Sequence, residues 1–233
     1  MKISAQMLKI IAQELSSWFD KRGRKFPWRF EKDVYKILVT EFLLQRTKSE
    51  TVERIYHEFF LKYPSIQSLA SAKKKELNKI FSRLGLRYRG DRLKKISLEI
   101  LRKFKGEIPS DLESLLKLKG VGSYIASAVL NFGYNIPTPV IDKNVLRVLN
   151  RHFNITSEIE ARKFVTELYK YGNHRKLAYA LIDVGSLLCK KTCSDKCPLL
   201  NITSVFPLRR DRWKMLRKVT DKKGKIKLRE QTV

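Results

Sequence analysis

The hydrophobic residues of the chain recur with a helical period along most of its length. Apolar side chains follow one another at intervals of three and four residues, a spacing typical of amphipathic helices. The helices that it predicts cover residues 3–19, 34–44, 49–62, 72–84, 93–104, 111–118, 123–132, 143–151, 157–171 and 174–189. No segment shows a convincing strand pattern, and no internal repeat is visible. The sequence therefore predicts an all-α fold.

One pair of predicted helices is joined by a glycine hairpin. Asp111 is a suitable N-cap for the first helix, and Gly120-Val121-Gly122 supplies a tight turn with two permissive residues. A turn that opens onto a helix N-terminus leaves backbone N–H groups available for a phosphate. The motif is weak alone, because any helical hairpin needs such a turn. It gains weight from Asp142, which stands at the start of another amphipathic helix, where its charge suits the helix dipole.

The charge of the chain narrows its expected partners. Its 233 residues contain 50 Lys and Arg against 23 Asp and Glu, a net charge of +27. This excess is larger than solubility requires and indicates a polyanion, although a protein that merely coats nucleic acid would share it. No apolar run approaches the ~18 residues of a membrane span. Residues 1–8 resemble an amphipathic helix rather than a signal peptide, so we expect an intracellular protein without a membrane partner.

One carboxylate stands on the apolar face of a predicted helix. Val34, Ile37, Leu38 and Glu41 share that face, and a carboxylate is costly to bury unless it has a partner. A structural hydrogen bond would explain Glu41, and so would a binding pocket. Arg46 follows at the helix end and could bond a guanine bidentately, although a solvated surface arginine is an equally simple interpretation.

Together these residues resemble the helix-hairpin-helix (HhH-GPD) DNA glycosylase superfamily. Its pattern is a Leu-x-Gly-Val-Gly hairpin followed by a Val-Asp-x-x-Val-x-Arg-Val segment, and the resemblance runs from about Leu15 to Thr203. Within the superfamily the chain is most similar to the archaeal thymine/uracil mismatch glycosylases, and next to the adenine glycosylases. The resemblance implies a six-helix-type domain of residues 26–136 and a second helical domain of residues 1–25 plus 137–206. It also implies a DNA-binding cleft between them, bordered by the hairpin and Asp142.

The resemblance implies roles for individual residues in breaking an N-glycosidic bond. Asp142 would be the carboxylate that stabilises an oxocarbenium-like sugar or activates water, with a simple N-cap as the alternative. Glu41 would hydrogen-bond or protonate the base after it has been flipped out of the duplex. The DNA-binding residues that it implies are Leu118, Gly120, Val121 and Gly122 at the hairpin, Gln45 and Arg46 beside the extruded base, and Leu86, Arg87, Arg89 and Lys143 elsewhere. For the arginines among them, a solvated helix face is the competing interpretation.

Tyr124 and Leu86 bear on the subclass. Where Tyr124 stands, bifunctional members of the superfamily have a lysine nucleophile, adenine glycosylases usually have serine, and the thymine/uracil enzymes have tyrosine. A phenol cannot form the imine of the lysine enzymes. Leu86 stands where adenine glycosylases typically have an aromatic residue. We therefore expect a monofunctional glycosylase that removes thymine or uracil opposite guanine. The alternatives are an adenine glycosylase acting opposite 8-oxoguanine, a bifunctional glycosylase/AP lyase, and a non-enzymatic DNA-binding module.

All three cysteines lie between residues 189 and 197, which indicates a metal or redox loop rather than a disulfide framework. The loop resembles the family's [4Fe–4S] loop, whose four cysteines are separated by six, two and five residues. Here Cys189, Cys193 and Cys197 are separated by three and three residues, and Thr203 stands where a fourth cysteine would. Three cysteines cannot supply four thiolates. A zinc site or a three-cysteine cluster stays open, but the contracted spacing argues against both, so we expect no metal and no cofactor.

The last 27 residues form a basic tail. Residues 207–233 contain 11 Lys and Arg and 3 Asp and Glu. Such a tail would add salt-dependent affinity for DNA, or it would be disordered. The expected partner is double-stranded DNA that carries a mismatched or damaged base, and the protein is expected to act as a monomer.

Overall fold

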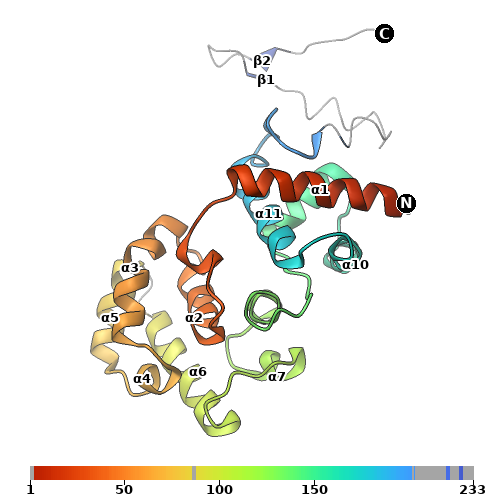
Figure 1. Ribbon diagram of the computed structural model, residues 1–233. Helices are drawn as coiled ribbons and strands as arrows, with labels where there is room; N and C mark the ends of the chain where they lie inside the picture. The colour runs from red at the N-terminus through yellow and green to blue at the C-terminus, as the bar shows by residue number, and fades with distance from the viewer. Residues whose placement is uncertain (1–2, 86–87, 201, 203–218, 221–225, 228–233) are drawn as a thin grey trace, which may run out of the picture. The chain divides into compact units, whose positions relative to one another are not determined.

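The computed structural model describes the chain except for residues 1–2, 86–87, 201, 203–218, 221–225 and 228–233. The described part is mostly helical, which confirms the all-α prediction (Figure 1). It divides into two compact units. One comprises Lys25–Val140, and the other combines Met1–Arg24 with Ile141–Val233. Whether the two units fold as independent domains with the bounds expected from the sequence stays a prediction.

The unit Lys25–Val140 is built around α2 (Val34–Leu44). Asp33 caps this helix by accepting hydrogen bonds from two backbone N–H groups of the first turn. Because α2 is apolar on nearly every side, it can be surrounded by other helices, and it packs against α3, α6, α8 and η2. The other elements of the unit are η1 (Pro27–Arg29), α3 (Ser49–Lys62), α4 (Ile66–Ala70), α5 (Lys74–Arg83), α6 (Tyr88–Phe104), α7 (Leu112–Lys117), α8 (Ser123–Ala128) and the π-helical η2 (Val129–Gly133).

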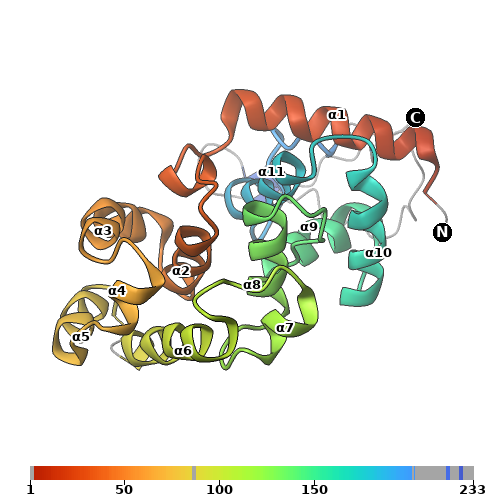
Figure 2. The same cartoon turned by 60° about the horizontal axis from the view of Figure 1, so that its bottom comes forward.

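Aromatic side chains fill much of the core of this unit. Phe42, Phe59 and Phe81 come from α2, α3 and α5 and are fully buried. Phe59 and Phe81 meet edge to face, a favourable geometry for two rings. Figure 2 shows α4, α5 and α6 on one side of this unit and α7 and α8 beyond them.

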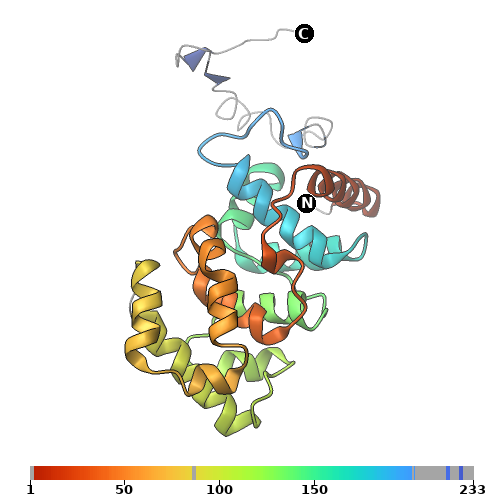
Figure 3. The ribbon, with the colours of Figure 1, turned by 60° about the vertical axis from the view of Figure 1, so that its left-hand side comes forward.

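The second unit joins the N-terminal helix to helices that follow Val140. These elements are α1 (Ala5–Arg22), α9 (Lys143–Phe153), α10 (Glu158–Tyr169) and α11 (His174–Leu187). The helix α11 packs against α1 and α9 (Figure 3). Each helix begins at a residue whose side chain accepts a backbone hydrogen bond, as expected of Ser, Asp and Asn N-caps. These caps are Ser4, Asp142, Ser157 and Asn173.

An ion pair ties the end of α1 to α11. Asp183 is fully buried, and its carboxylate accepts hydrogen bonds from the backbone N–H of Arg24 at 2.9 Å and from the guanidinium at 2.9 and 2.6 Å. Such a forked arrangement satisfies a buried carboxylate that would otherwise be costly. The pair therefore fixes α1 on α11.

Two details differ from the sequence pattern. The segment before α5 forms a separate short helix, α4, whose Ser65 and Ser68 make a capping box. The described parts of the tail contain a two-stranded antiparallel ladder of β1 (Val219–Thr220) and β2 (Ile226–Lys227), which was not predicted. Most of the basic tail lies outside the described residues. Among those that are described, no helix has the length and apolar character needed to cross a bilayer.

Candidate active site

The glycine hairpin joins α7 to α8 and keeps its backbone at the surface. Leu118 and Val121 are buried, at 1% and 5% exposed, whereas Gly120 and Gly122 are exposed. The N–H of Val121 donates to the carbonyl of Leu118 at 3.0 Å and closes the turn. The two apolar side chains therefore anchor the hairpin while the glycine backbone faces solvent, as contact with a phosphate requires.

Gly120 is required by both its backbone and its surroundings. Its φ is +104°, outside the small left-handed region that other residues can enter. A Cβ at this position would stand 2.9 Å from Cδ of Arg92 and 3.5 Å from Cδ1 of Ile96, both on α6. The backbone N–H of the preceding residue, Lys119, donates to Oε2 of Glu99 on the same helix at 3.3 Å. The turn is thus held against α6.

Tyr124 and Glu41 belong to helices that contact each other within this unit. Tyr124 is in the first turn of α8, half-buried, and packs against the hydrophobic core. Glu41 is only 6% exposed on α2, which packs against α8 and η2. The continuation of α8 as a π-helix is uncommon and often accompanies a functional site. The prediction that Glu41 is buried on the apolar face is confirmed.

The residues after α2 form a short exposed turn. Gln45 is the C-cap of α2 and half-buried. Arg46 is exposed and adopts the left-handed conformation, with φ of +55°. The N–H of Thr47 then donates to the carbonyl of Leu44 at 3.2 Å. This turn presents the Arg46 side chain to solvent.

Arg89 does not have the position expected of a DNA-backbone contact. It is 1% exposed, and its guanidinium donates to Oγ1 of Thr47 at 3.1 Å. A buried arginine must satisfy its charge inside the protein, so its role here is to hold the turn that carries Arg46. This burial argues against the predicted DNA contact, and Arg89 is not part of the proposed DNA-binding surface. The predicted contacts Leu86 and Arg87 lie outside the described residues.

Asp142 begins α9 in the other unit. Its Oδ1 accepts from the N–H of Val145 at 2.7 Å, and its Oδ2 accepts from the side chain of Asn144 at 2.9 Å. Asp142 is half-buried, and the next residue, Lys143, is exposed. The N-cap role considered as the alternative is therefore present. Since an ionised carboxylate has about four lone-pair sites, two hydrogen bonds leave it able to act on a substrate as well.

The partner of Asp142 is itself held in place. Arg147 donates to Oδ1 of Asn144 at 2.7 Å, to the carbonyl of Gly185 at 2.7 Å and to the carbonyl of Cys189 at 2.6 Å. A Cβ on Gly185 would stand 2.8 Å from the backbone oxygen of Asn144. The helices α9 and α11 thus approach closely at this glycine. Arg147 is the arginine of the Val-Asp-x-x-Val-x-Arg-Val segment, but its role in orienting Asp142 through Asn144 was not predicted, and neither was the close approach at Gly185.

The three cysteines lie together with one histidine. Nε2 of His152 is 3.5 Å from Sγ of Cys193 and 3.6 Å from Sγ of Cys197, and a ring nitrogen of His152 lies within 4.8 Å of Sγ of Cys189. The hydrogen bond with Cys193 and burial raise the pKa of Cys189 to about 12. His152, which stands 37 residues before Cys189 on a predicted helix, is not among the predicted site residues.

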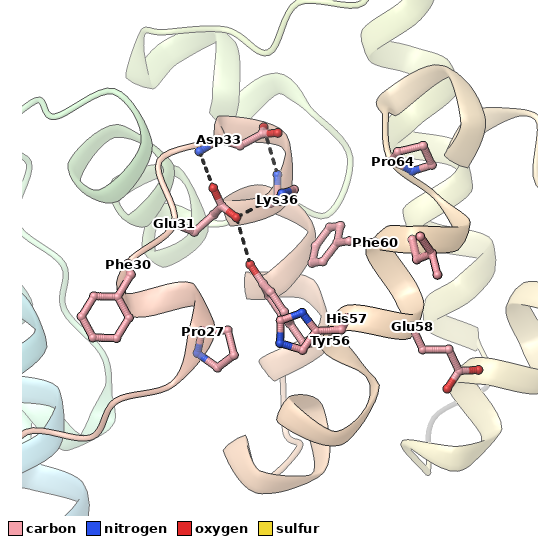
Figure 4. Close-up of a pocket in the computed structure, with 11 residues that line it drawn as sticks. Pro27, Phe30, Glu31, Asp33, Lys36, Tyr56, His57, Glu58, Phe60 and Pro64 are labelled. Carbon is pink, nitrogen blue, oxygen red and sulfur yellow. Dashed lines mark hydrogen bonds and ion pairs between the residues drawn. The ribbon is translucent and has the colours of Figure 1, made fainter.

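A shallow pocket lies elsewhere on the unit Lys25–Val140 (Figure 4). Glu31 accepts from the hydroxyl of Tyr56 at 3.4 Å and pairs with Lys36 at 3.3 Å at its edge. The pocket is lined by Pro27, Phe30, Glu31, Asp33, Lys36, Tyr56, His57, Glu58, Phe60, Leu61 and Pro64. None of these is a predicted site residue, and we assign the pocket no part in the site.

Comparisons with known proteins identify the family. The model of the HhH-GPD superfamily of base excision DNA repair proteins matches residues 39–173. The chain is 35% identical over 208 residues to a thymine/uracil-DNA glycosylase of Pyrobaculum aerophilum, covering 84% of this chain and 90% of that protein. It is 31% identical over 201 residues to an adenine DNA glycosylase of Buchnera aphidicola, covering 84% of this chain and 57% of that protein.

A solved structure agrees with these relatives. The fold is similar to that of a thermostable thymine-DNA glycosylase, with a TM-score of 0.75 and 28% identity over 79% of this chain and 88% of that one. The hairpin of α7 and α8 and the start of α9 both fall inside the matched segment. The chain therefore belongs to the HhH-GPD superfamily of base excision DNA repair proteins and is a DNA-binding DNA glycosylase.

Proposed function

We propose that this glycosylase removes thymine or uracil mispaired with guanine and leaves an abasic site. The observation that carries the proposal is Tyr124 at the start of α8, the position of the lysine nucleophile in bifunctional members. Two relatives are named thymine/uracil-DNA glycosylases, and both are matched over 90% or more of their length. These relatives support the choice of base, and Tyr124 supports hydrolysis without an imine.

The chemistry requires a negative charge and a water molecule beside the sugar. When the N-glycosidic bond breaks, the sugar becomes oxocarbenium-like and the base leaves with the bonding electrons. The Asp142 carboxylate would stabilise the positive charge and orient or deprotonate the attacking water. Its hydrogen bonds with Val145 and Asn144 hold it in one orientation and leave about two of its four lone-pair sites for the substrate. The hydrolysis would then use only protein groups and water.

The remaining roles concern the base and the DNA. Glu41, buried on α2, would hydrogen-bond the extruded pyrimidine or protonate it as it leaves. Tyr124 would line the pocket that receives the extruded base. Gln45 and the exposed Arg46 would enter the duplex near the vacated position, where the arginine could bond the orphaned guanine. Each of these roles can be tested by a single substitution.

The DNA backbone would rest on the glycine hairpin. The exposed backbone of Gly120 and Gly122 would hold a phosphate by its N–H groups, helped by the N-terminus of α8. Leu118 and Val121 would contribute indirectly, because their buried side chains anchor the turn. Lys143 would contact a second phosphate beside Asp142. We propose that one molecule of the protein acts on double-stranded DNA.

An adenine glycosylase is the second candidate, favoured by the match to the adenine DNA glycosylase of Buchnera aphidicola. The chain spans only 57% of that protein. Tyr124 stands where those enzymes usually have serine. Substrate assays separate the two candidates directly.

The test is a single-turnover glycosylase assay. Duplexes containing G·T, G·U, A·8-oxoguanine or thymine glycol are incubated with excess protein and analysed with and without alkali. We expect strand cleavage of the G·T and G·U duplexes that depends on alkali, because hydrolysis alone leaves the strand intact at an abasic site. Cleavage of the adenine strand only would establish the second candidate. Cleavage without alkali would refute monofunctional hydrolysis.

Asp142→Asn tests the carboxylate, and Asp111→Asn is its matched control. Both aspartates are N-caps, of α9 and α7, and asparagine preserves an N-cap. We expect Asp142→Asn to bind DNA normally and to lose about 10²-fold or more in single-turnover rate. Asp111→Asn should retain the wild-type rate. Equal rates in the two variants would show that Asp142 is only a cap.

A further inference from the structure

The three thiols and the imidazole converge from two separate parts of the chain. His152 is in the last turn of α9, and the cysteines lie in the loop after α11 (blue in Figure 1). His152, Cys189 and Cys197 are buried, at 3%, 0% and 5% exposed. Packing of α9 on α11 brings these segments together. The donors are therefore fixed by the fold rather than by a flexible loop alone.

The distances from His152 to two of the thiols match those around a single tetrahedral ion. With Zn–S of about 2.3 Å, Zn–N of about 2.0–2.1 Å and tetrahedral angles, sulfur and nitrogen ligands are separated by about 3.6 Å. Nε2 of His152 is 3.5 Å from Sγ of Cys193 and 3.6 Å from Sγ of Cys197. The donor atoms of His152, Cys189 and Cys193 all lie within 4.8 Å of one another. Three sulfurs and one imidazole nitrogen are also a common donor set of structural zinc sites.

A four-iron cluster does not fit this arrangement. Each ligand of such a cluster binds a different iron, so its ligand atoms stand farther apart than the corners of a single-ion tetrahedron. Sγ of Cys189 and Sγ of Cys193 lie within 4.8 Å of each other. The short loop also brings the two residues into an antiparallel bridge. The loop is therefore shaped for one ion.

One guanidinium, that of Arg151, lies beside the thiols. NH1 of Arg151 lies 3.0 Å from Sγ of Cys189, and its NH2 donates to the carbonyls of Lys190 and Lys191 at 3.1 and 3.0 Å. Three thiolates around Zn²⁺ leave one net negative charge, which this guanidinium would balance. Outer groups of this kind orient metal ligands and tune the site.

Ordinary packing explains less of the arrangement. A reduced cysteine packs well as a small apolar group, so the thiols alone would be unremarkable. A buried histidine that directs one ring nitrogen at two sulfurs fits a ligand better than a core residue. We propose that His152, Cys189, Cys193 and Cys197 bind one structural zinc ion. Three thiols would release their protons to solvent as the ion binds, and the imidazole would bind through neutral Nε2.

The ion would stabilise the second unit rather than take part in catalysis. His152 is ten residues after Asp142, and a helix rises about 1.5 Å per residue, so the ion would lie at the opposite end of α9 from the carboxylate. It would join the end of α9 to the loop that follows α11. Since binding of a structural metal contributes to folding free energy, removal of the ion should lower the melting temperature of the protein.

Metal content and a cobalt spectrum test the proposal. The full chain is produced without a histidine tag, in medium that supplies both zinc and iron, and purified under reducing conditions. We expect zinc at close to one equivalent per chain by mass spectrometry, with little iron and no sulfide. After exchange, Co²⁺ should give the absorption of a tetrahedral thiolate site. A chelator should lower the melting temperature, and added zinc should restore it.

Substitutions show which residues hold the ion. His152→Ala should lose most of the zinc, whereas His57→Ala, a change to a histidine outside the site, should retain it. His152→Cys restores a fourth ligand and should bind zinc again, which separates loss of a ligand from loss of folding. The proposal is overturned if folded wild-type protein binds no zinc, if it carries iron and sulfide in stoichiometric amounts, or if His152→Ala keeps its zinc.

Discussion

Alanine substitutions at the two glycines of the hairpin should have different effects on stability. Gly120→Ala places a Cβ on a backbone with φ of +104°, 2.9 Å from Cδ of Arg92. Gly122→Ala places a Cβ on an ordinary extended backbone, with φ of −93° and no atom within 4 Å. The substitutions are chemically identical and two residues apart. Only the local geometry separates their expected effects.

The magnitudes follow from that geometry. A non-glycine residue held in a sparsely populated conformation costs about 1–3 kcal/mol. The Arg92 side chain is flexible and can move, so it adds less than a clash with backbone would. For a chain of this size, such a loss lowers the melting temperature by about 2–4 °C per kcal/mol. Gly122→Ala lowers the free energy of unfolding slightly because alanine is a poorer N-cap, and raises it slightly because the unfolded chain becomes stiffer. We therefore expect a net change within about 0.5 kcal/mol.

For DNA binding we expect the opposite order, with Gly122→Ala having the larger effect on affinity. If a phosphate rests over the hairpin, the open space at Gly122 is where it approaches, and a methyl group there weakens binding without unfolding the protein. Thermal unfolding and titration of a labelled duplex, at several salt concentrations, measure both quantities. Neither substitution changes a charge, so the salt dependence should stay the same. Equal loss of stability in both variants would refute the backbone argument, and wild-type affinity of Gly122→Ala would refute the phosphate position.

Four further predictions concern other parts of the protein. Asp183→Asn removes the buried negative charge that faces the half-buried Arg24. It should lower the free energy of unfolding in a urea titration by up to about 3 kcal/mol, the lower end of the range for a broken buried pair, whereas a loss below about 1 kcal/mol would contradict the pair's role. Gly185→Ala should push α9 from α11 at Asn144 and slow base removal more than it weakens DNA binding; an unchanged single-turnover rate would contradict this. Thr47→Val removes one hydroxyl that accepts from buried Arg89 and should lower the free energy of unfolding by about 1–3 kcal/mol. Arg46→Gly, which suits the left-handed backbone, should leave stability intact and reduce activity on mismatched duplexes. Tyr124→Lys should introduce strand cleavage without alkali and a reducible covalent complex with DNA, and failure to trap one would show that residue 124 does not face the sugar.

The local features of the fold could be predicted from the sequence because their causes are local. Helical periodicity places most of the helices, and a residue such as Asp142 caps the helix that follows it wherever that helix packs. The burial of Glu41 could be inferred for the same reason, since the face of a helix on which a residue lies depends only on spacing. The short helix α4 was missed because its apolar pattern is too brief to show a period.

Whether a charged residue is buried depends on contacts with residues that are distant in the sequence. Arg89 lies in a basic segment that looks solvated, yet it is 1% exposed because α6 lies against the end of α2 and Thr47 accepts its hydrogen bond. That acceptor is 42 residues away in sequence. A run of arginines therefore predicts a positive surface, but it does not say which of its members points inward.

The cysteine loop shows how such distant packing changes a chemical conclusion. Three cysteines cannot supply a four-thiolate cluster, and the contracted spacing argued against a zinc site or a three-cysteine cluster. The fourth donor comes from α9, and His152 carries no mark that separates it from an ordinary helical histidine. Because α9 packs on α11, its last turn delivers an imidazole to the loop, at distances that suit one small ion. The proposed zinc site therefore accounts for the contracted spacing of the cysteines, since a loop too short to surround four irons can still surround a single tetrahedral ion.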